Sequence, residues 1–332
     1  MQPKIKNNKI FITGGAGYVG AVLTPYLLNK GYEVTVLDLM IYGENVLQKN
    51  PNLKMIKGDI RNIEILKKEL PSHNTLIHLA CISNDPSFEL NPELGKSINL
   101  DAFSPLVDIS KKSGINRFVY ASSSSVYGIK DEPNVNEKMS LEPLTEYSKF
   151  KADCETIKKK NKSNNFIPIV IRPATVCGYS PRQRLDVVVN ILTNLAYHKK
   201  EISVFGGEQL RPNIHILDMV RAYDYLINAK EELVSGQIFN AGYENQTVNH
   251  LASLVKKVIG EDVKIKYLKT DDNRSYHISS QKIKDVLGFE TKKSIEDAIK
   301  DLKNAFDTKK LDNTLTNEKY FNIKRMNNLN LK

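Results

Sequence analysis

A glycine-rich turn near the start of the chain constrains its fold more than any other stretch. Gly14, Gly17 and Gly20 stand three residues apart, after an apolar run at 10–12 and before an amphipathic stretch at 18–30. This order predicts a buried strand, a tight turn and a helix. Such a turn brings backbone N–H groups at a helix N-terminus close to a pyrophosphate. The spacing differs from the commonest dinucleotide fingerprint, G-x-G-x-x-G, so purely structural glycines stay an alternative at this point.

An acidic residue follows the second predicted strand. Residues 32–37 are typical of a strand, and Asp38 comes directly after them. A parallel β-α-β unit places an acidic residue there, against the adenosine ribose of a dinucleotide. The carboxylate would accept hydrogen bonds from ribose hydroxyls and repel a 2′-phosphate, and residues 39–41 include no arginine that could neutralise one. NAD is therefore favoured over NADP, although Asp38 could also be a solvent-facing turn residue.

Composition and charge narrow the class of protein. The 332 residues carry a formal net charge of +10, and no arginine–aromatic interleaving accompanies it, which favours anionic small ligands over nucleic acid. The three cysteines, Cys81, Cys154 and Cys177, form no C-x-x-C pair, so a reducing compartment is expected. The six histidines are scattered, and we expect no metal site. Without a signal-peptide pattern or a membrane-spanning apolar run, a cytoplasmic protein with no membrane partner is expected.

Apolar strand-like runs alternate with helical stretches through the first half of the chain. This alternation predicts an α/β fold with a doubly wound parallel sheet and helices on both faces. Further strands are predicted at 55–57, 75–81, 117–122 and 166–171. Further helices are predicted at 63–70, 97–113 and 146–160.

The pattern loosens after Gly178, which suggests a second, smaller lobe. We expect residues 1–177 to form the nucleotide-binding domain, with a later strand near 236–241 returning to it. Residues 178–307 are expected to form an interleaved substrate-binding lobe, with short strands and helices that include 213–216 and 219–229. Residues 308–332 are polar and asparagine-rich, and are expected to form a tail that either wraps against the molecule or frays.

A tyrosine, a lysine and a serine indicate chemistry. Tyr147 and Lys151 are four residues apart on a predicted helix, so they share a face. An ammonium near a phenol favours the phenolate and makes it usable as a base on a sugar hydroxyl. The pairs Tyr26/Lys30 and Tyr320/Lys324 have the same spacing without such a context. Tyr147 differs because a strand precedes it and ends in a serine-rich loop, at the edge where open α/β sheets bind ligands.

Taken together, these residues resemble the extended short-chain dehydrogenase/reductase family, specifically its nucleotide-sugar epimerase/dehydratase branch. The resemblance covers about residues 9–306. It implies a Rossmann fold, NAD as cofactor, a nucleoside-diphosphate sugar as substrate, and a homodimer or tetramer paired through the helices at 97–113 and 146–160. It also implies that Ser123, Tyr147 and Lys151 are catalytic, with Tyr147 as base or acid and Lys151 on the nicotinamide ribose, lowering the pKa of the tyrosine.

The resemblance also assigns binding residues. The implied cofactor-binding residues are Gly14, Gly17, Tyr18, Val19, Gly20, Asp38, Asp59, Ile60, Leu79, Ala80, Asn99, Tyr147, Lys151 and Pro173. The implied substrate-binding residues are Ser83, Ser124, Thr175, Arg182, Arg184, Arg211 and Arg274. Arg211 and Arg274 match arginines that family members place on the substrate pyrophosphate, where bidentate contacts suit the anion.

Departures from the family pattern bear on the reaction. Dehydratases carry an acidic residue directly after the catalytic hydroxyl, whereas this chain has Ser124 and Ser125, so dehydration is disfavoured. Oxidation at C4 of the sugar remains: a 4-epimerase if the keto sugar takes the hydride back on its other face, or a 4-dehydrogenase if the keto sugar leaves. Thr175 stands where many epimerases have asparagine, and residues 174–186 are similar to members that oxidise C4 of nucleotide-linked heptoses.

Two other functions stay open. A dehydratase could take its acid from elsewhere, for instance from Glu137. A non-enzymatic NAD-binding scaffold could use the same fold, although such proteins commonly lose the tyrosine or the lysine.

Overall fold

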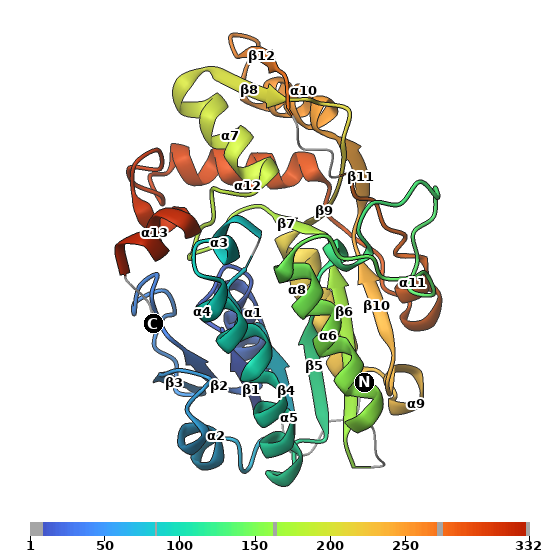
Figure 1. The fold of residues 1–332 in the computed structure, drawn as a ribbon. Coiled ribbons are helices and arrows are strands. Elements are labelled where there is room, and N and C mark those ends of the chain that lie inside the picture. The colour runs from blue at the N-terminus through green and yellow to red at the C-terminus, as the bar shows by residue number, and fades with distance from the viewer. Residues whose placement is uncertain (1–8, 84, 162–164, 271–274, 330–332) are drawn as a thin grey trace.

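A seven-stranded parallel sheet forms the centre of the molecule (Figure 1). The computed structural model describes residues 9–83, 85–161, 165–270 and 275–329. Within them the strand order is β10-β6-β5-β4-β1-β2-β3, and each neighbouring pair is parallel. The predicted doubly wound α/β fold is confirmed. The strands are β1 (Lys9–Thr13), β2 (Glu33–Asp38), β3 (Leu53–Lys57), β4 (Thr75–His78), β5 (Arg117–Ala121), β6 (Ile167–Pro173) and β10 (Ile238–Ala241).

Helices cover both faces of this sheet. One face packs against α1 and α8, and the other packs against α2, α5 and α6. The helices of this part are α1 (Gly20–Asn29), α2 (Ile63–Glu69), α3 (Asp85–Glu89), α4 (Pro92–Lys96), α5 (Phe103–Lys112), α6 (Glu146–Asn161), α8 (Ile216–Asn228) and α9 (Glu231–Val234). Two short turns complete it: a π-helical turn, η1 (Ser97–Asp101), and a 3-10 turn, η2 (Ser124–Tyr127).

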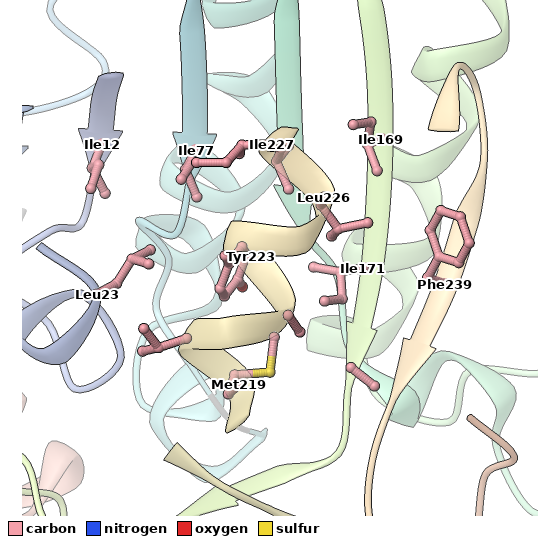
Figure 2. Close-up of a cluster of buried hydrophobic side chains, with 14 of the residues drawn as sticks. Ile12, Leu23, Ile77, Ile169, Ile171, Met219, Tyr223, Leu226, Ile227 and Phe239 are labelled. Carbon is pink, nitrogen blue, oxygen red and sulfur yellow. The ribbon is translucent and has the colours of Figure 1, made fainter. Parts of the chain in front are cut away.

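The central strands are apolar on both sides because helices bury both of their faces. Figure 2 shows α8 lying across the sheet, with its side chains pointing into a cluster built from several strands. Burial of this apolar surface is the main favourable term in folding such a sheet. Residues in the cluster include Ile12, Ile77, Ile169, Ile171, Met219, Tyr223, Leu226, Ile227 and Phe239.

Two predicted elements differ from the structure. The strand predicted at 75–81 ends at His78, and the backbone after it turns beneath the glycine turn, where Leu79 N donates to Thr13 O. The helix predicted at 97–113 is divided into η1 and α5. Pro105 lies in the first turn of α5 and has no N–H to offer the carbonyl four residues earlier, so a continuous α-helix would lose a hydrogen bond there.

A smaller body sits at the carboxyl-terminal edge of the large sheet (Figure 1). It holds a three-stranded sheet in the order β11-β9-β7 and a two-stranded sheet of β12 and β8. The helix α8, in the segment assigned from sequence to this lobe, packs on the large sheet instead, and β10 pairs with β6 of that sheet. The strands are β7 (Thr175–Cys177), β8 (Glu201–Phe205), β9 (Leu210–His215), β11 (Glu244–Thr247) and β12 (Lys264–Leu268). The helices are α7 (Val188–Lys199), α10 (Val248–Ile259), α11 (Gln281–Leu287) and α12 (Ile295–Asp307).

The C-terminal segment packs back onto the molecule. After α12 it forms a 3-10 turn, η3 (Glu318–Tyr320), and the helix α13 (Asn322–Leu329). The segment buries Leu311, Thr314, Asn322 and Met326, and α13 contacts α3. It is therefore an integral part of the fold rather than a fraying tail.

Two kinds of feature are absent from the described residues. No helix among them combines the length and apolar character needed to cross a membrane. No group of three or more histidine, cysteine, aspartate or glutamate side chains among them is arranged to hold a metal ion.

A buried ion pair joins α6 to β6 beneath the serine-rich loop. The Arg172 guanidinium donates from Nη2 to Glu155 Oε2 at 2.6 Å and from Nε to Glu155 Oε1 at 2.9 Å. Ser122 Oγ also donates to Glu155 Oε1, at 2.6 Å, and Arg172 Nη1 donates to Tyr127 Oη at 2.7 Å. The pair thereby fixes both ends of the loop that carries Ser123. The pair contributes mainly by holding the loop in place. A buried ion pair adds little stability over apolar packing, but breaking it is costly.

We predict that Glu155→Gln lowers the free energy of unfolding by about 3 kcal/mol, because it leaves the Arg172 charge buried without its partner. Urea denaturation measures the change. The control is Glu146→Gln on the same helix, whose partner Lys149 is about half exposed; it should cost at most about 1 kcal/mol. Equal losses for the two variants would contradict the proposed role of the buried pair.

Candidate functional site

A cavity of about 460 Å³ opens at the carboxyl-terminal edge of the large sheet. It lies between β1 and β4, where the strand order reverses: the chain continues from β1 to β2 on one side and from β4 to β5 on the other. Open α/β sheets bind ligands at such a switch point. The wall comes from the turn after β1, the loops after β2, β4 and β5, the start of α6, and the segments after β6.

Most of the residues predicted from sequence line this one cavity. From the cofactor set these are Gly14, Gly17, Tyr18, Val19, Gly20, Asp38, Asp59, Ile60, Leu79, Ala80, Tyr147, Lys151 and Pro173. From the substrate set these are Ser83, Ser124, Thr175, Arg182, Arg184 and Arg211, and Ser123 joins them. Asn99 does not line the cavity, and Arg274 lies outside the described residues. The structure thus supplies the shared location, while each residue's role stays a prediction.

The glycine turn rests directly on the backbone after β4. Gly14 has a φ of +75°, and a Cβ atom placed on it would lie 2.6 Å from the backbone nitrogen of Ala80. No side chain fits in that space, and a positive φ already favours glycine. The turn is held by Gly14 N, which donates to Leu37 O at 2.8 Å. No side chain caps the N-terminus of α1, and its first turn contains no acidic residue, so no group of the chain competes with an anion for the positive end of the helix dipole.

Asp38 is placed at the end of β2, facing the cavity. Its Oδ2 accepts a hydrogen bond from Ala16 N at 3.0 Å, and its Oδ1 accepts one from Met40 N at 2.7 Å. Burial raises the pKa of this carboxyl, whereas the two backbone N–H groups and the Arg182 guanidinium lower it, with a net rise. The backbone hydrogen bonds orient the carboxylate at the position where a dinucleotide's ribose is held.

Asp59, also in the cavity wall, is engaged by a neighbour. Arg61 donates to both of its carboxylate oxygens, at 3.1 Å from Nε to Oδ1 and at 2.6 Å from Nη2 to Oδ2. Burial pushes the pKa of Asp59 upward, but the hydrogen bonds and charge of Arg61 outweigh it, and the net pKa is lowered. With its carboxylate oxygens bonded to Arg61, Asp59 offers the cavity mainly its backbone.

Ser123, Tyr147 and Lys151 lie close together in the cavity wall. Ser123 ends the stretch that follows β5, and its Oγ caps η2 by accepting a hydrogen bond from Ser125 N at 3.1 Å. Tyr147 and Lys151 lie on successive turns at the start of α6, as their spacing predicts. Lys151 Nζ donates to Ala121 O at 2.7 Å and lies 5.9 Å from the centre of the Tyr147 ring.

The expected lowering of the Tyr147 pKa does not hold in this structure. Burial raises the pKa of the phenol, and the nearby Cys81 and Asp85 side chains raise it further. Arg184 and a hydrogen bond with Ser123 lower it without reversing the direction. The spacing of tyrosine and lysine could not show how deeply the phenol is buried, and burial dominates.

Asn99 has a different role from the one predicted. Its side-chain amide lies behind the loop after β4, where Oδ1 accepts from Ile82 N at 2.8 Å and Nδ2 donates to Ile82 O at 2.9 Å. Asn99 is buried within η1, and its carbonyl oxygen receives the thiol of Cys154. It therefore shapes the cavity wall by holding the loop, rather than by contact with a ligand.

Several lining residues were not found from the sequence. The most important are Tyr42, Asp85 and Asn322. Asp85 accepts a hydrogen bond from Thr145 Oγ1 and so links the loop after β4 to the start of α6. Tyr42 stands four residues after Asp38, and an aromatic residue so close to a predicted nucleotide site could have been recognised from the sequence as a lining residue. Asn322 gave no signal, because its neighbours in space are far away in sequence.

The glycine turn, the oriented Asp38 and the cavity at the switch point define a dinucleotide-binding α/β protein with a tyrosine–lysine pair. Comparison with known proteins gives its family. Residues 10–242 match the model of the NAD dependent epimerase/dehydratase family. The chain belongs to this family, and its cofactor is NAD.

Individual relatives span both reactions of the family. The chain is 32% identical over 266 residues to an uncharacterized UDP-glucose epimerase of Bacillus subtilis, covering 76% of this chain and 82% of the relative. It is 29% identical over 273 residues to a dTDP-D-glucose 4,6-dehydratase of Dictyostelium discoideum, covering 76% of this chain but only 61% of the relative. Among solved structures, the UDP-glucose 4-epimerase of Thermotoga maritima, determined with UDP-glucose, gives a TM-score of 0.82 at 26% identity over 91% of this chain and 99% of that one.

The residues around the cavity fit NAD. The space that a Cβ at Gly14 would fill is a cradle of backbone, and Asp38 offers a carboxylate beside it. The uncapped N-terminus of α1 would take the pyrophosphate, Asp38 would take the adenosine ribose, and Lys151, beside Tyr147, would take the nicotinamide ribose.

We predict that Gly14→Ala weakens NADH binding by roughly tenfold or more. The added Cβ must push the backbone at Ala80 away, and a loss of only about 1.4 kcal/mol in binding free energy lowers the affinity tenfold. Fluorescence titration with NADH measures it. The control is Gly31→Ala, which shares a positive φ of +88° but has open space around it. It should cost about 1–2 kcal/mol of stability with NADH affinity unchanged. If both variants lost NADH affinity to the same extent, backbone strain at a positive φ, rather than the close approach of Gly14 to Ala80, would govern binding.

Proposed function

We propose that the chain oxidises the C4 hydroxyl of a nucleoside-diphosphate sugar, acting as a 4-epimerase or a 4-dehydrogenase. The observation that supports this most directly is that Ser123, Tyr147 and Lys151 lie close together in the wall of the cavity that the glycine turn also lines. Arg211, in β9, lies in the wall contributed by the smaller body, and a guanidinium there suits a substrate pyrophosphate. Relatives named for UDP-glucose epimerisation agree with this class of substrate.

The chemistry divides into a proton and a hydride. When bound, NAD supplies the acceptor for the hydride that leaves C4. The proton of the C4 hydroxyl passes to the Tyr147 oxygen, which acts as a base in its deprotonated form. Because burial raises the pKa of Tyr147, little phenolate exists near neutral pH, and Tyr147 acts as the base only when ligand binding brings this pKa down. The Ser123 hydroxyl, hydrogen-bonded to the tyrosine, would orient the same sugar oxygen.

A dehydratase is the second candidate. Ser124 and Ser125 follow the proposed catalytic serine, and neither hydroxyl is an acid near neutral pH. Glu137 is not in the cavity wall. Its carboxylate instead accepts a hydrogen bond from Asn240 N at 2.7 Å. Asp85, however, does line the cavity and acts electrostatically on Tyr147. An elimination that uses Asp85 as its acid is the form of this alternative that the structure favours.

The test is a panel of nucleotide sugars, with different bases and C4 epimers, incubated with the NAD-loaded protein. Transient growth of the NADH absorbance band with an isomeric product would identify an epimerase. Lasting growth with a keto product would identify a dehydrogenase, and loss of water detected by mass spectrometry would identify a dehydratase. If no sugar reduces the bound NAD, the proposal of an enzyme acting at C4 is wrong, and a non-enzymatic NAD-binding scaffold is favoured.

We predict that Tyr147→Phe lowers kcat by about 10²–10⁴-fold, because it removes the proton acceptor while keeping the ring. NADH affinity should stay unchanged. The matched control is Tyr26→Phe, whose tyrosine also stands four residues before a lysine but donates to Asp224 Oδ2 at 3.2 Å, away from the cavity. Full turnover by Tyr147→Phe would rule out the assignment of the base.

A further inference from the structure

Asn322, at the start of α13, connects three loops around the cavity. Its side-chain oxygen accepts hydrogen bonds from Arg182 Nη2 at 2.6 Å and from Tyr42 Oη at 3.0 Å. Its side-chain nitrogen donates to Ser83 Oγ at 3.1 Å, and its backbone nitrogen donates to Asp186 Oδ2 at 2.9 Å. The residue is 3% exposed. Asn322 therefore ties the loops after β2, β4 and β7 together from a segment that comes last in the chain.

The Asn322 side chain binds the guanidinium group of Arg182, which has no carboxylate partner among the described residues. Arg182 is buried, and its guanidinium lies 3.4 Å from the centre of the Tyr42 ring. Within the described part of the chain, no ion pair joins Arg182 to an acidic group, and its buried Nε has no hydrogen-bond partner. Burying a cation in this way is costly unless an anion completes its surroundings.

Arg184, two residues further on, repeats the pattern in part. Its Nε donates to Asp186 Oδ1 at 2.7 Å, while its buried Nη2 has no hydrogen-bond partner. The other oxygen of Asp186 is taken by the backbone nitrogen of Asn322. Only one of the two guanidinium groups thus has a carboxylate partner, and within the described residues each holds one buried N–H donor without a hydrogen bond. Both residues line the cavity.

The two arginines extend along the cavity. The charge of Arg182 acts on Asp38, and the charge of Arg184 acts on Tyr147. A phosphate bound beside both guanidinium groups would supply the anion that Arg182 lacks. Guanidinium donors match phosphate oxygens in geometry as well as in charge.

We propose that Arg182 and Arg184 form a phosphate subsite, and that Asn322 is the positioning residue that orients Arg182 toward it. The C-terminal segment would thereby complete the ligand site from outside the dinucleotide-binding fold. Arg325 strengthens this arrangement, because its Nε donates to Ile41 O at 2.6 Å and so holds the same loop as Tyr42. The phosphate can come from NAD or from the substrate's diphosphate, and the second source rests on the proposed function.

The test compares Asn322→Ala, Asn322→Asp and the control Asn327→Ala, an exposed asparagine on the same helix. Asn322→Asp keeps an oxygen acceptor for Arg182 and Tyr42 but places a carboxylate on the guanidinium that would receive the phosphate. Two dissociation constants are measured for each variant: NADH by fluorescence, and inorganic pyrophosphate by calorimetry on the NADH-saturated protein. Thermal unfolding reports any loss of structure.

If the subsite holds the cofactor, both Asn322 variants should weaken NADH binding by about tenfold, the scale of a hydrogen bond to a charged group. If it holds the substrate diphosphate, NADH binding should be unchanged and pyrophosphate binding should weaken by about the same factor. Asn322→Asp should do this without a large fall in unfolding temperature. The proposal is overturned if both ligands bind the Asn322→Asp variant as they bind Asn327→Ala, or if pyrophosphate fails to bind the wild type and NADH is unaffected. These measurements need no turnover, so they stand even if the proposed reaction proves wrong.

Discussion

The contact between the glycine turn and the backbone after β4 is the constraint on which the rest of the site depends. Two stretches of main chain can approach this closely only because Gly14 carries no side chain. Their approach sets the floor of the cavity, and it brings the N-terminus of α1, the end of β2 and the loop after β4 to one place. The binding of a dinucleotide here is thus decided by backbone packing before any polar side chain takes part.

Buried arginines serve two different ends in this protein. Arg172 has its carboxylate partner, Glu155, and the pair gives the serine-rich loop a fixed support. Arg182 has an amide and an aromatic ring instead, and the neighbouring Arg184 holds the carboxylate. A fully paired guanidinium is satisfied by the fold alone, whereas an incompletely paired one in a cavity wall is suited to a ligand. The degree of pairing, more than burial itself, is therefore the reason we propose a binding role for Arg182 and a structural role for Arg172.

Much of the fold and part of the site could be predicted from the sequence, because both depend on local patterns. The apolar runs, the glycine spacing and the tyrosine–lysine spacing are each visible within a few residues, and they placed Asp38, Ser123, Tyr147 and Lys151 on one cavity. The remainder depends on contacts between distant segments. The pKa of Tyr147 follows from how deeply its ring is buried, Asn99 turned out to hold a loop, and the place of Asn322 depends on where the last helix packs. No spacing in the sequence carries that information.

The chain passes between the large sheet and the smaller body through very short connections. A single residue, Ala174, separates β6 from β7; β9 runs directly into α8; and only two residues lie between β10 and β11. Such joints leave little freedom for the two bodies to swing apart as a hinge would require. Entry and exit of a large ligand must then rely on loop movement at the rim of the cavity. We therefore expect loop movement around a fixed cavity rather than hinge closure of the two bodies.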